Sequence, residues 1–226
     1  MKRIWHISDT HTYHELLKVP ENIDIVIFSG DCTIPKEPHL NEVQVVNFLD
    51  WFIKLPIKHK VFVAGNHDVS IERGYIDKNI FALNHVIYLE NETCIIEGIK
   101  MWGSPITPTF GEGWAYNVAR HKIGRAWENI PKDVDVLITH GPPKNILDLT
   151  ITRDRELDRC GCKSLFNKVE EIKPKLHLFG HIHNCEDIIN AGTKQIPGLN
   201  TIFSNGSVVT DRKFGQVTSN GNILEI

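Results

Sequence analysis

The sequence predicts an α/β protein, in which helices cover sheets of buried strands. Short apolar runs rich in β-branched and aromatic residues recur along the chain, and most are bounded by Gly, Asn or Asp. Segments in which apolar residues follow a helical spacing lie between some of these runs. Strands that alternate with helices are typical of layered α/β folds. The length of 226 residues fits one large domain or two small ones.

The expected strands come first, because they are the clearest signal. They are the runs IWHIS, DIVIFSG, KVFVAG, HVIYLE, CIIEGIKMWG, DVLITH, LHLFGH and TIFSNG. The dipeptide Asn220–Gly221 lies between two strand-like halves of residues 213–226, which predicts a hairpin there.

Three segments predict helices, namely 42–54, 116–130 and 162–173. The apolar positions at helical spacing are Val43, Val46, Leu49 and Ile53 in the first segment, Val118, Ile123, Ala126, Trp127 and Ile130 in the second, and Leu165, Val169 and Ile172 in the third. Proline follows the first and third segments, at Pro56 and Pro174, where it ends a helix.

Composition excludes several classes of protein. The net charge is −3, so no overall basic field attracts nucleic acid, and we do not expect nucleic acid as a partner. No apolar stretch approaches the ~18 residues of a membrane span, and the N-terminus lacks the apolar region of a signal peptide. The five cysteines are scattered and odd in number, which favours free thiols in the reducing cytoplasm.

Chemically active side chains follow five of the apolar runs at the point where each run ends. They are Asp9 and His11, then Asp31, then Asn66, His67 and Asp68, then His140, and finally His181 and His183. Ligands bind at the carboxyl ends of strands in open α/β sheets. We therefore expect these side chains to meet at one edge of the sheets.

The donor types in this set indicate a metal centre. Carboxylate oxygen with imidazole nitrogen, and no thiolate, suits Mn²⁺, Fe, Zn²⁺ or Co²⁺, and we expect Mn²⁺. Seven ligands are enough for two ions that share one carboxylate: Asp9, His11, Asp31, Asn66, His140, His181 and His183. Two such ions lower the pKa of water and clamp the oxygens of an in-line displacement, and the remaining positive charge suits a phosphate ester.

The same residues lie in blocks that resemble the five signature blocks of the calcineurin-like metallophosphoesterases. The blocks here are DTH, GDC, GNHD, THGPP and GHIH, and the resemblance spans residues 9–183. The stretches WGSPITPTFGEGWAYN, ENIPKDVDVLITHGPP and GCKSLFNKVEEIKPKLHLFGHIH are most similar to the metallophosphoesterase-domain (MPPED) phosphodiesterases.

This resemblance implies a single domain over residues 1–226 with a four-layer α/β/β/α sandwich and mixed sheets. It also implies which ligands belong to which ion: Asp9, His11 and His183 to one, Asn66, His140 and His181 to the other, and Asp31 to both. In addition, His67 is expected near the leaving group. By the general logic of oriented acid–base pairs, Asp68 is expected to orient the His67 ring.

The resemblance also bears on the reaction. Many family members carry Asp or Arg soon after the GD block, whereas this chain has GDCTIPK, which disfavours phosphomonoester and phosphoprotein substrates. Because His183 completes the last block, we expect an active enzyme. The leading hypothesis is a phosphodiesterase that hydrolyses cyclic nucleotides or other small phosphodiesters by attack of a metal-bridged hydroxide.

Alternatives remain beside this hypothesis. A phosphomonoesterase or nucleotide pyrophosphatase of the same fold is the second, and a catalytically silent metal-binding scaffold is the third. A nuclease is disfavoured by the low net charge. A small phosphodiester or nucleotide is the expected partner, a homodimer is left open, and no membrane is expected.

A few further positions have two interpretations each. Asn205 and Ser207 could line the site or form a plain turn, and Asp148 could support a ligand histidine or be a solvated loop carboxylate. Residues 152–161 could form a lid or a solvated loop. The aromatic residues before the fourth block could stack on a nucleobase or pack in the core. They are Trp102, Phe110, Trp114 and Tyr116.

Overall fold

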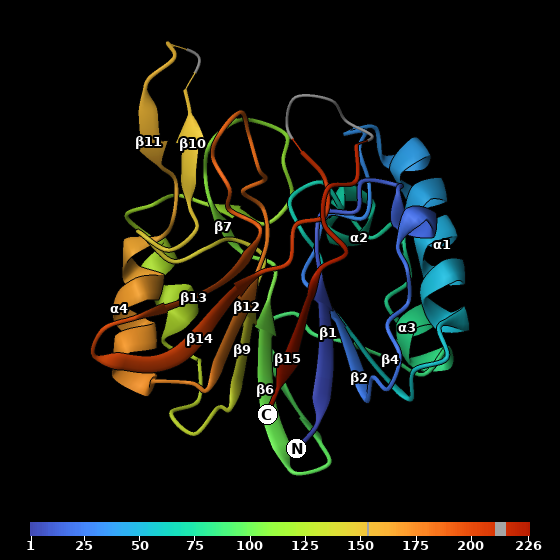
Figure 1. Ribbon diagram of the computed structural model, residues 1–226. Coiled ribbons are helices and arrows are strands. Elements are labelled where there is room, and N and C mark those ends of the chain that lie inside the picture. Colours follow the sequence, from blue (N-terminus) through green and yellow to red (C-terminus); the bar gives the residue numbers. More distant parts are fainter. Residues whose placement is uncertain (153, 211–215) are drawn as a thin grey trace.

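Two β-sheets pack face to face in the computed structural model, and helices cover the outer face of each sheet (Figure 1). The structure describes residues 1–152, 154–210 and 216–226. Residues 213–215 of the expected hairpin, and residue 153 of the expected lid, lie outside this description. The layers run helix, sheet, sheet, helix, as expected for the four-layer sandwich.

The first sheet has five strands in the order β15-β1-β2-β3-β4. Their bounds are β1 (Arg3–Ile7), β2 (Ile25–Phe28), β3 (His59–Phe62), β4 (Val86–Tyr88) and β15 (Asn222–Glu225). Strands β1 to β4 are parallel, and β15 pairs with β1 antiparallel. The expected hairpin at Asn220–Gly221 is therefore wrong, because residues 222–225 pair with the edge of β1 instead.

The second sheet has six strands in the order β13-β14-β12-β9-β6-β5. Their bounds are β5 (Glu92–Ile96), β6 (Ile99–Ser104), β9 (Val136–Thr139), β12 (Leu176–Phe179), β13 (Gly192–Ile196) and β14 (Leu199–Asn205). The four inner strands are parallel, and the two edge strands are antiparallel to their neighbours. Two small ribbons add β7 (Thr107–Pro108) with β8 (Asn117–Val118), and β10 (Leu149–Ile151) with β11 (Leu157–Arg159).

Helices cover the two outer faces. They are α1 (Pro38–Lys54), α2 (Val69–Glu72) and α3 (Asn79–Leu83) on the first sheet, and α4 (Lys163–Ile172) on the second; the 3₁₀ turns are η1 (His14–Leu16) and η2 (Ile123–Trp127). Helix α1 begins at Pro38, where the carboxylate of Glu37 accepts hydrogen bonds from the backbone N–H groups of residues 39 and 40. The helix expected over 162–173 is confirmed as α4.

The alternation of side chains along each strand separates three hydrophobic layers. In β1, Trp5 and Ile7 face the helices, whereas Ile4 faces the second sheet. In β12, Phe179 packs toward α4, whereas Leu176 and Leu178 fill the space between the sheets. Because successive side chains point to opposite faces, a strand that is buried on both faces is apolar throughout.

The expected face of α1 needs correction. Val43 and Val46 are exposed, and the buried positions of the helix are Asn41, Val45, Phe48, Leu49 and Phe52. The aromatic side chains determine this orientation, since they remove more apolar surface from water than valine does. The helix expected over 116–130 is also shorter than predicted, because residues 117–118 pair with β7 and only η2 is helical.

We expect Phe48→Ala to lower the free energy of unfolding by about 3–5 kcal/mol, because it leaves a cavity in the layer below α1. Phe48 is fully buried, and its ring centroid lies 4.4 Å from that of Phe28 and 5.3 Å from that of Phe52. Urea unfolding measures the change. Val43→Ala on the opposite side of α1 is the matched control, with an expected change within about 0.5 kcal/mol. Equal effects of the two changes would contradict this helix orientation.

The parallel strands place their carboxyl ends along one edge of the sandwich. Strands β1, β2 and β3 of the first sheet and β9, β12 and β14 of the second all end there (Figure 1). The loops after these strands therefore lie next to one another, which is the geometry that a shared site requires.

Candidate metal centre

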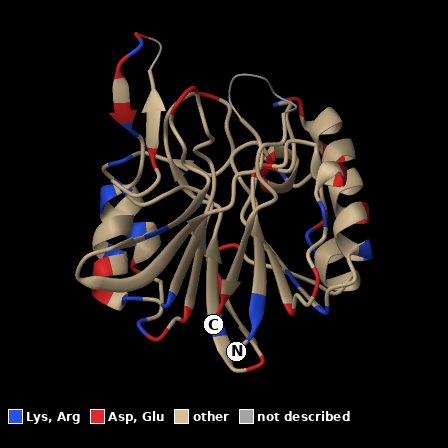
Figure 2. Cartoon of the chain, in the orientation of Figure 1, with Lys and Arg blue, Asp and Glu red and all other residues tan. Residues whose placement is uncertain are grey.

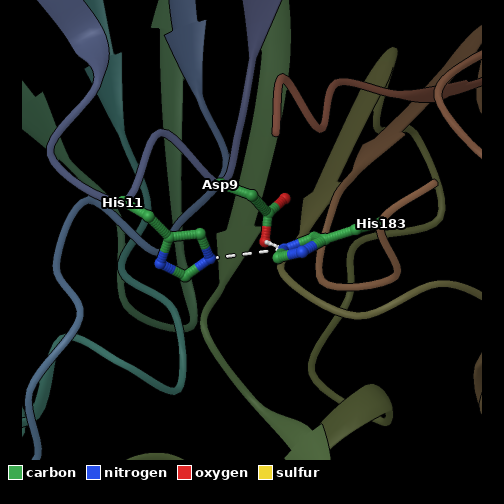
Figure 3. A group of neighbouring side chains, drawn as sticks. All are labelled: Asp9, His11 and His183. Carbon is green, nitrogen blue, oxygen red and sulfur yellow. Dashed lines mark hydrogen bonds and ion pairs between the residues drawn. The ribbon is translucent and has the colours of Figure 1, made fainter. Parts of the chain in front are cut away.

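Asp9, His11 and His183 form a first group at this edge (Figure 3). Nε2 of His183 lies 3.2 Å from Oδ1 of Asp9 and 3.3 Å from Nε2 of His11. One oxygen and two imidazole nitrogens thus point at the same small volume, although the residues follow β1 and β12 in different sheets.

Asp31, His140 and His181 form a second group. Nε2 of His140 lies 3.3 Å from Oδ2 of Asp31 and 2.9 Å from Oδ1 of Asn66. A third group links Asp31 to His11 and His67, so that Asp31 belongs to both sides of the centre. The structure therefore brings together all seven residues that the sequence nominates as ligands, with Asp31 in the middle.

Backbone carbonyl groups orient the histidine rings. The pairs are His11 Nδ1 with Thr33 O (2.7 Å), His140 Nδ1 with Ser29 O (2.8 Å) and His67 Nδ1 with Ile34 O (2.9 Å). A carbonyl oxygen only accepts, so each Nδ1 carries the proton, and in a neutral ring the lone pair is on Nε2. This arrangement of a carbonyl behind the ring is common among metal-binding histidines. Sequence reasoning missed these groups, since a carbonyl has no side-chain signature.

The carboxylate of Asp9 is fixed on its other side. Ser207 Oγ donates to Oδ2 of Asp9 at 2.6 Å, and the backbone N–H of His181 lies 3.0 and 2.9 Å from the two oxygens. Ser207 thus lines the site, whereas Asn205 mainly shapes the turn by donating to the carbonyl of Ile182 and accepting from the backbone N–H of Ser207.

Asp68 has a different position from the one expected. The Ile34 carbonyl holds the His67 ring, whereas the Asp68 carboxylate accepts from the backbone N–H groups of Gly65 (2.8 Å), Asp31 (3.0 Å) and Cys32 (3.0 Å). The expected orientation of His67 by Asp68 is therefore wrong. Fully buried, Asp68 instead ties the loop after β2 to the loop after β3.

Several residues of the centre have left-handed backbone conformations, which is unusual for residues other than glycine. The φ angles are 52° at Asp9, 40° at His11, 64° at Asp31 and 69° at His181. Such conformations cost of the order of 1–3 kcal/mol each and cluster at functional sites. Here they allow consecutive loops to turn sharply enough for their side chains to face one point.

Gly65 allows the two halves of the centre to approach closely. A Cβ atom at position 65 would overlap Oδ1 of Asp31, and would lie 2.5 Å from the Asp31 nitrogen and 2.7 Å from Cε1 of His140. A side chain at this position would therefore displace two of the candidate ligands.

The electrostatics favour cations. Burial acts to raise the pKa of Asp31, but the charges of His140 and His67 hold it well below its ordinary value. Burial acts to lower the pKa of His140, yet Asp31 and Asp9 raise it to about 9. Burial lowers the pKa of His11 to about 4, which leaves its ring neutral at pH 7 and able to bind a metal. Two buried carboxylates thus attract positive charge to the centre.

The other positions that the sequence left with two interpretations are Asp148, residues 152–161 and the aromatic residues before the fourth block. The Asp148 carboxylate bonds to the backbone N–H groups of Asn145 (2.8 Å) and Gly161 (3.1 Å) and pairs with Arg159, so it supports a loop and not a ligand histidine. The described part of 152–161 belongs largely to the β10–β11 ribbon, which projects at the same end of the molecule (Figure 1). Trp102 and Tyr116 are buried in the core, whereas Phe110 and Trp114 lie beside the centre.

The profile of the calcineurin-like phosphoesterase family matches residues 2–185, which include every residue of the two ligand groups. The chain belongs to the calcineurin-like phosphoesterase family. The family is one of phosphoric ester hydrolases that use divalent metals.

Two curated relatives are similar to most of this chain. The chain is 31% identical over 231 residues to human metallophosphoesterase domain-containing protein 1, a match that covers 90% of this chain and 65% of the relative. It is also 31% identical over 214 residues to UPF0046 protein K07C11.7 of Caenorhabditis elegans, covering 89% and 68%. The chain thus spans somewhat less than two thirds of the human relative.

Solved structures share the fold. Phosphopantetheinyl hydrolase (PptH) from Mycobacterium tuberculosis aligns with a TM-score of 0.58 and 14% identity, over 93% of this chain and 90% of that one. TT1561 of Thermus thermophilus aligns with a TM-score of 0.56 and 16% identity, over 90% and 88%. At these identities the likenesses show that the overall fold is shared.

The donor set fits the divalent metals that the family uses. Each of the two groups combines carboxylate oxygen with imidazole nitrogen, and the Nδ1 atoms of His11 and His140 are held by carbonyl groups while their Nε2 atoms point inward. Neutral imidazole and carboxylate are ligands of borderline divalent ions.

None of the helices in the described residues has the length and apolar character of a membrane span.

Proposed function

We propose that this chain is a dinuclear metal-dependent phosphodiesterase that hydrolyses small phosphodiesters, cyclic nucleotides among them. The convergence of two ligand groups on Asp31 carries the proposal, because two neighbouring groups that share a carboxylate suit two ions. Asp9, His11 and His183 would hold one ion, and His140, His181 and Asn66 the other. We take Mn²⁺ as the ion, with Fe, Zn²⁺ and Co²⁺ as alternatives.

The bound ions would supply a water molecule of lowered pKa and neutralise charge on the phosphoryl oxygens. The chain itself contributes orientation and a proton. Ser207 and the His181 amide hold Asp9 in one orientation, and Asp68 fixes the backbone of Asp31. His67 is held through Nδ1, and Nε2 of its protonated ring, 4.0 Å from Oδ2 of Asp31, would give a proton to the leaving oxygen and leave the ring neutral.

The preference for a diester is supported by the run that follows Asp31. Residues Thr33 and Ile34 direct carbonyl oxygens at histidine rings, and no arginine occurs between residues 31 and 37. A monoester dianion gains more from a guanidinium than a diester monoanion does, since the dianion carries twice the charge. In the view of Figure 2, Lys and Arg are interspersed with Asp and Glu over the described chain, which supports a small substrate and not nucleic acid.

The remaining aspects of the proposal concern the whole chain. Residues 1–226 would act as one domain, supported by the pairing of β15 with β1. The thiols of Cys32, Cys94, Cys160 and Cys162 are free, which supports the reducing cytoplasm as the compartment. A homodimer remains a proposal to be checked by the mass of the protein in solution.

We expect the Mn²⁺-loaded protein to hydrolyse bis-p-nitrophenyl phosphate with a higher kcat/KM than p-nitrophenyl phosphate, and to lose both activities after chelation. Release of p-nitrophenol measures both reactions, and re-addition of Mn²⁺ is the control for irreversible damage. A strong preference for the monoester would support the phosphomonoesterase instead. No activity and no bound metal after Mn²⁺ addition would support the silent scaffold.

A further inference from the structure

Two aromatic residues that are not candidate ligands lie directly beside the metal centre. The ring centroid of Phe110 lies 5.0 Å from that of His181, and the ring centroid of Trp114 lies 4.3 Å from that of His67. The two aromatic rings are 5.7 Å apart. Phe110 and Trp114 thus connect a candidate ligand of one ion with the residue expected at the leaving group.

These contacts extend a chain of rings around the centre. His67 contacts His11 with a centroid distance of 4.7 Å, and His181 contacts His140 with a distance of 5.0 Å. Phe110 is 49% exposed, which makes it the most exposed residue of this chain of rings.

The loop that carries Phe110 is firmly anchored. The backbone N–H of Thr109 donates to Val118 O at 3.0 Å, Lys36 Nζ donates to Glu112 O at 2.8 Å, and Arg73 Nη2 donates to Gly113 O at 3.1 Å. These bonds hold the backbone of the loop on both sides of Phe110, at its base and near its end.

Trp114 is held from two sides. Lys36 Nζ lies 3.7 Å from the centroid of the indole, and a Cβ at Gly111 would lie 3.3 Å from Trp114 Nε1, so the backbone of the loop packs against the indole. Trp114 is half-buried and contacts both Phe110 and His67, and Phe110 is the more exposed of the two aromatic residues.

A single exposed phenylalanine on a surface is ordinary and needs no function. Phe110 differs from that ordinary case in two respects. Its loop is held by three hydrogen bonds, and its ring contacts a candidate metal ligand. A rigid aromatic ring beside a phosphoryl site offers a planar surface that costs a ligand little ordering, and stacking on it tolerates different planar groups.

We propose that Phe110, supported by Trp114, is a platform on which a planar aromatic group of the substrate stacks while the phosphoryl group lies at the metal centre. The substrates would then be phosphoesters that carry an aryl group or a nucleobase. This proposal rests on the proposed function, because it takes the centre between Asp31 and His67 as the phosphoryl site.

The test compares ligands that differ in the planar group alone. Calorimetry measures the binding of phenylphosphonate against cyclohexylphosphonate, and of adenosine 5′-monophosphate against ribose 5-phosphate, to the Mn²⁺-loaded protein. We expect the aromatic member of at least one pair to bind about fivefold or more tightly. Phe110→Leu should abolish this preference, whereas Phe110→Tyr should keep it. Leu83→Ala, an exposed apolar position on α3, is the control that should leave it unchanged.

A preference in the adenosine pair identifies a nucleobase as the natural group, and a preference confined to the phenyl pair identifies a smaller aryl group. Equal or absent binding within both pairs, or a preference that Phe110→Leu preserves, would each overturn the platform. Because calorimetry does not require turnover, these outcomes are separate from failure of the proposed hydrolysis, which the nitrophenyl assay reports.

Discussion

Asp31→Asn is expected to lower kcat for the diester by roughly 10³-fold or more, because the carboxylate that we propose two ions share would lose its negative charge. Metal ions contribute several kcal/mol to stabilisation of the transition state, and about 4 kcal/mol corresponds to this factor. The Asp31 side chain is almost fully buried, with Oδ2 3.3 Å from Nε2 of His140. Steady-state rates with saturating Mn²⁺ and elemental analysis of bound metal measure the two effects.

The matched control is Asp50→Asn on the exposed side of α1, which changes the net charge equally. It should retain wild-type rates and metal content. Full activity of Asp31→Asn with two equivalents of bound metal would refute the central position of this carboxylate.

Gly65→Ala is expected to reduce both metal binding and stability, although it adds only one methyl group. The new Cβ would overlap Oδ1 of Asp31 and lie 2.7 Å from Cε1 of His140, and the neighbouring backbone at Asp31 leaves no room for relaxation. Overpacking of this kind costs about 1–3 kcal/mol and occasionally more. The displaced carboxylate should also lower metal affinity. Thermal unfolding of the apoprotein and titration with Mn²⁺ measure the two quantities.

Gly124→Ala is the control for this change. A Cβ there would lie 3.8 Å from Cβ of Ser164, which is an ordinary van der Waals contact, so stability and metal affinity should stay close to wild type. If Gly65→Ala behaved like Gly124→Ala, the centre would be more deformable than its contacts indicate.

The features that could be predicted from sequence have strong local signals. Strands such as β1 and β12 are short apolar runs that end in polar residues, and the parallel order then brings Asp9 and His183 to one edge. The family resemblance and the four layers followed from the same blocks, and both are confirmed.

Other features depend on contacts that no pattern in the sequence reveals. The orientation of α1 is determined by how Phe48 and Phe52 fit against the first sheet, which competes with the valine stripe at 43 and 46. The last strand pairs with β1 and, among the described residues, not with 216–221, because a free sheet edge offers unpaired backbone groups.

The detail of the site was the hardest to predict. The adjacency of Asp68 to His67 in sequence suggests an acid–base pair, yet the sharp turn after β3 directs Asp68 to the backbone of residues 31–32. Every residue has a backbone carbonyl group, so the sequence cannot reveal that those of Ser29 and Thr33 are the ones that hold histidine rings.

The separation of the centre's residues along the chain determines when it can form during synthesis. Asp9 is 174 positions from His183 and 198 from Ser207, the two side chains that its carboxylate oxygens contact. At ribosomal rates of 5–20 residues per second, Ser207 is synthesised roughly 10 to 40 s after Asp9. A nascent chain that ends at β12 therefore lacks His181 and His183, and one that ends at β14 still lacks the Ser207 hydroxyl that orients Asp9.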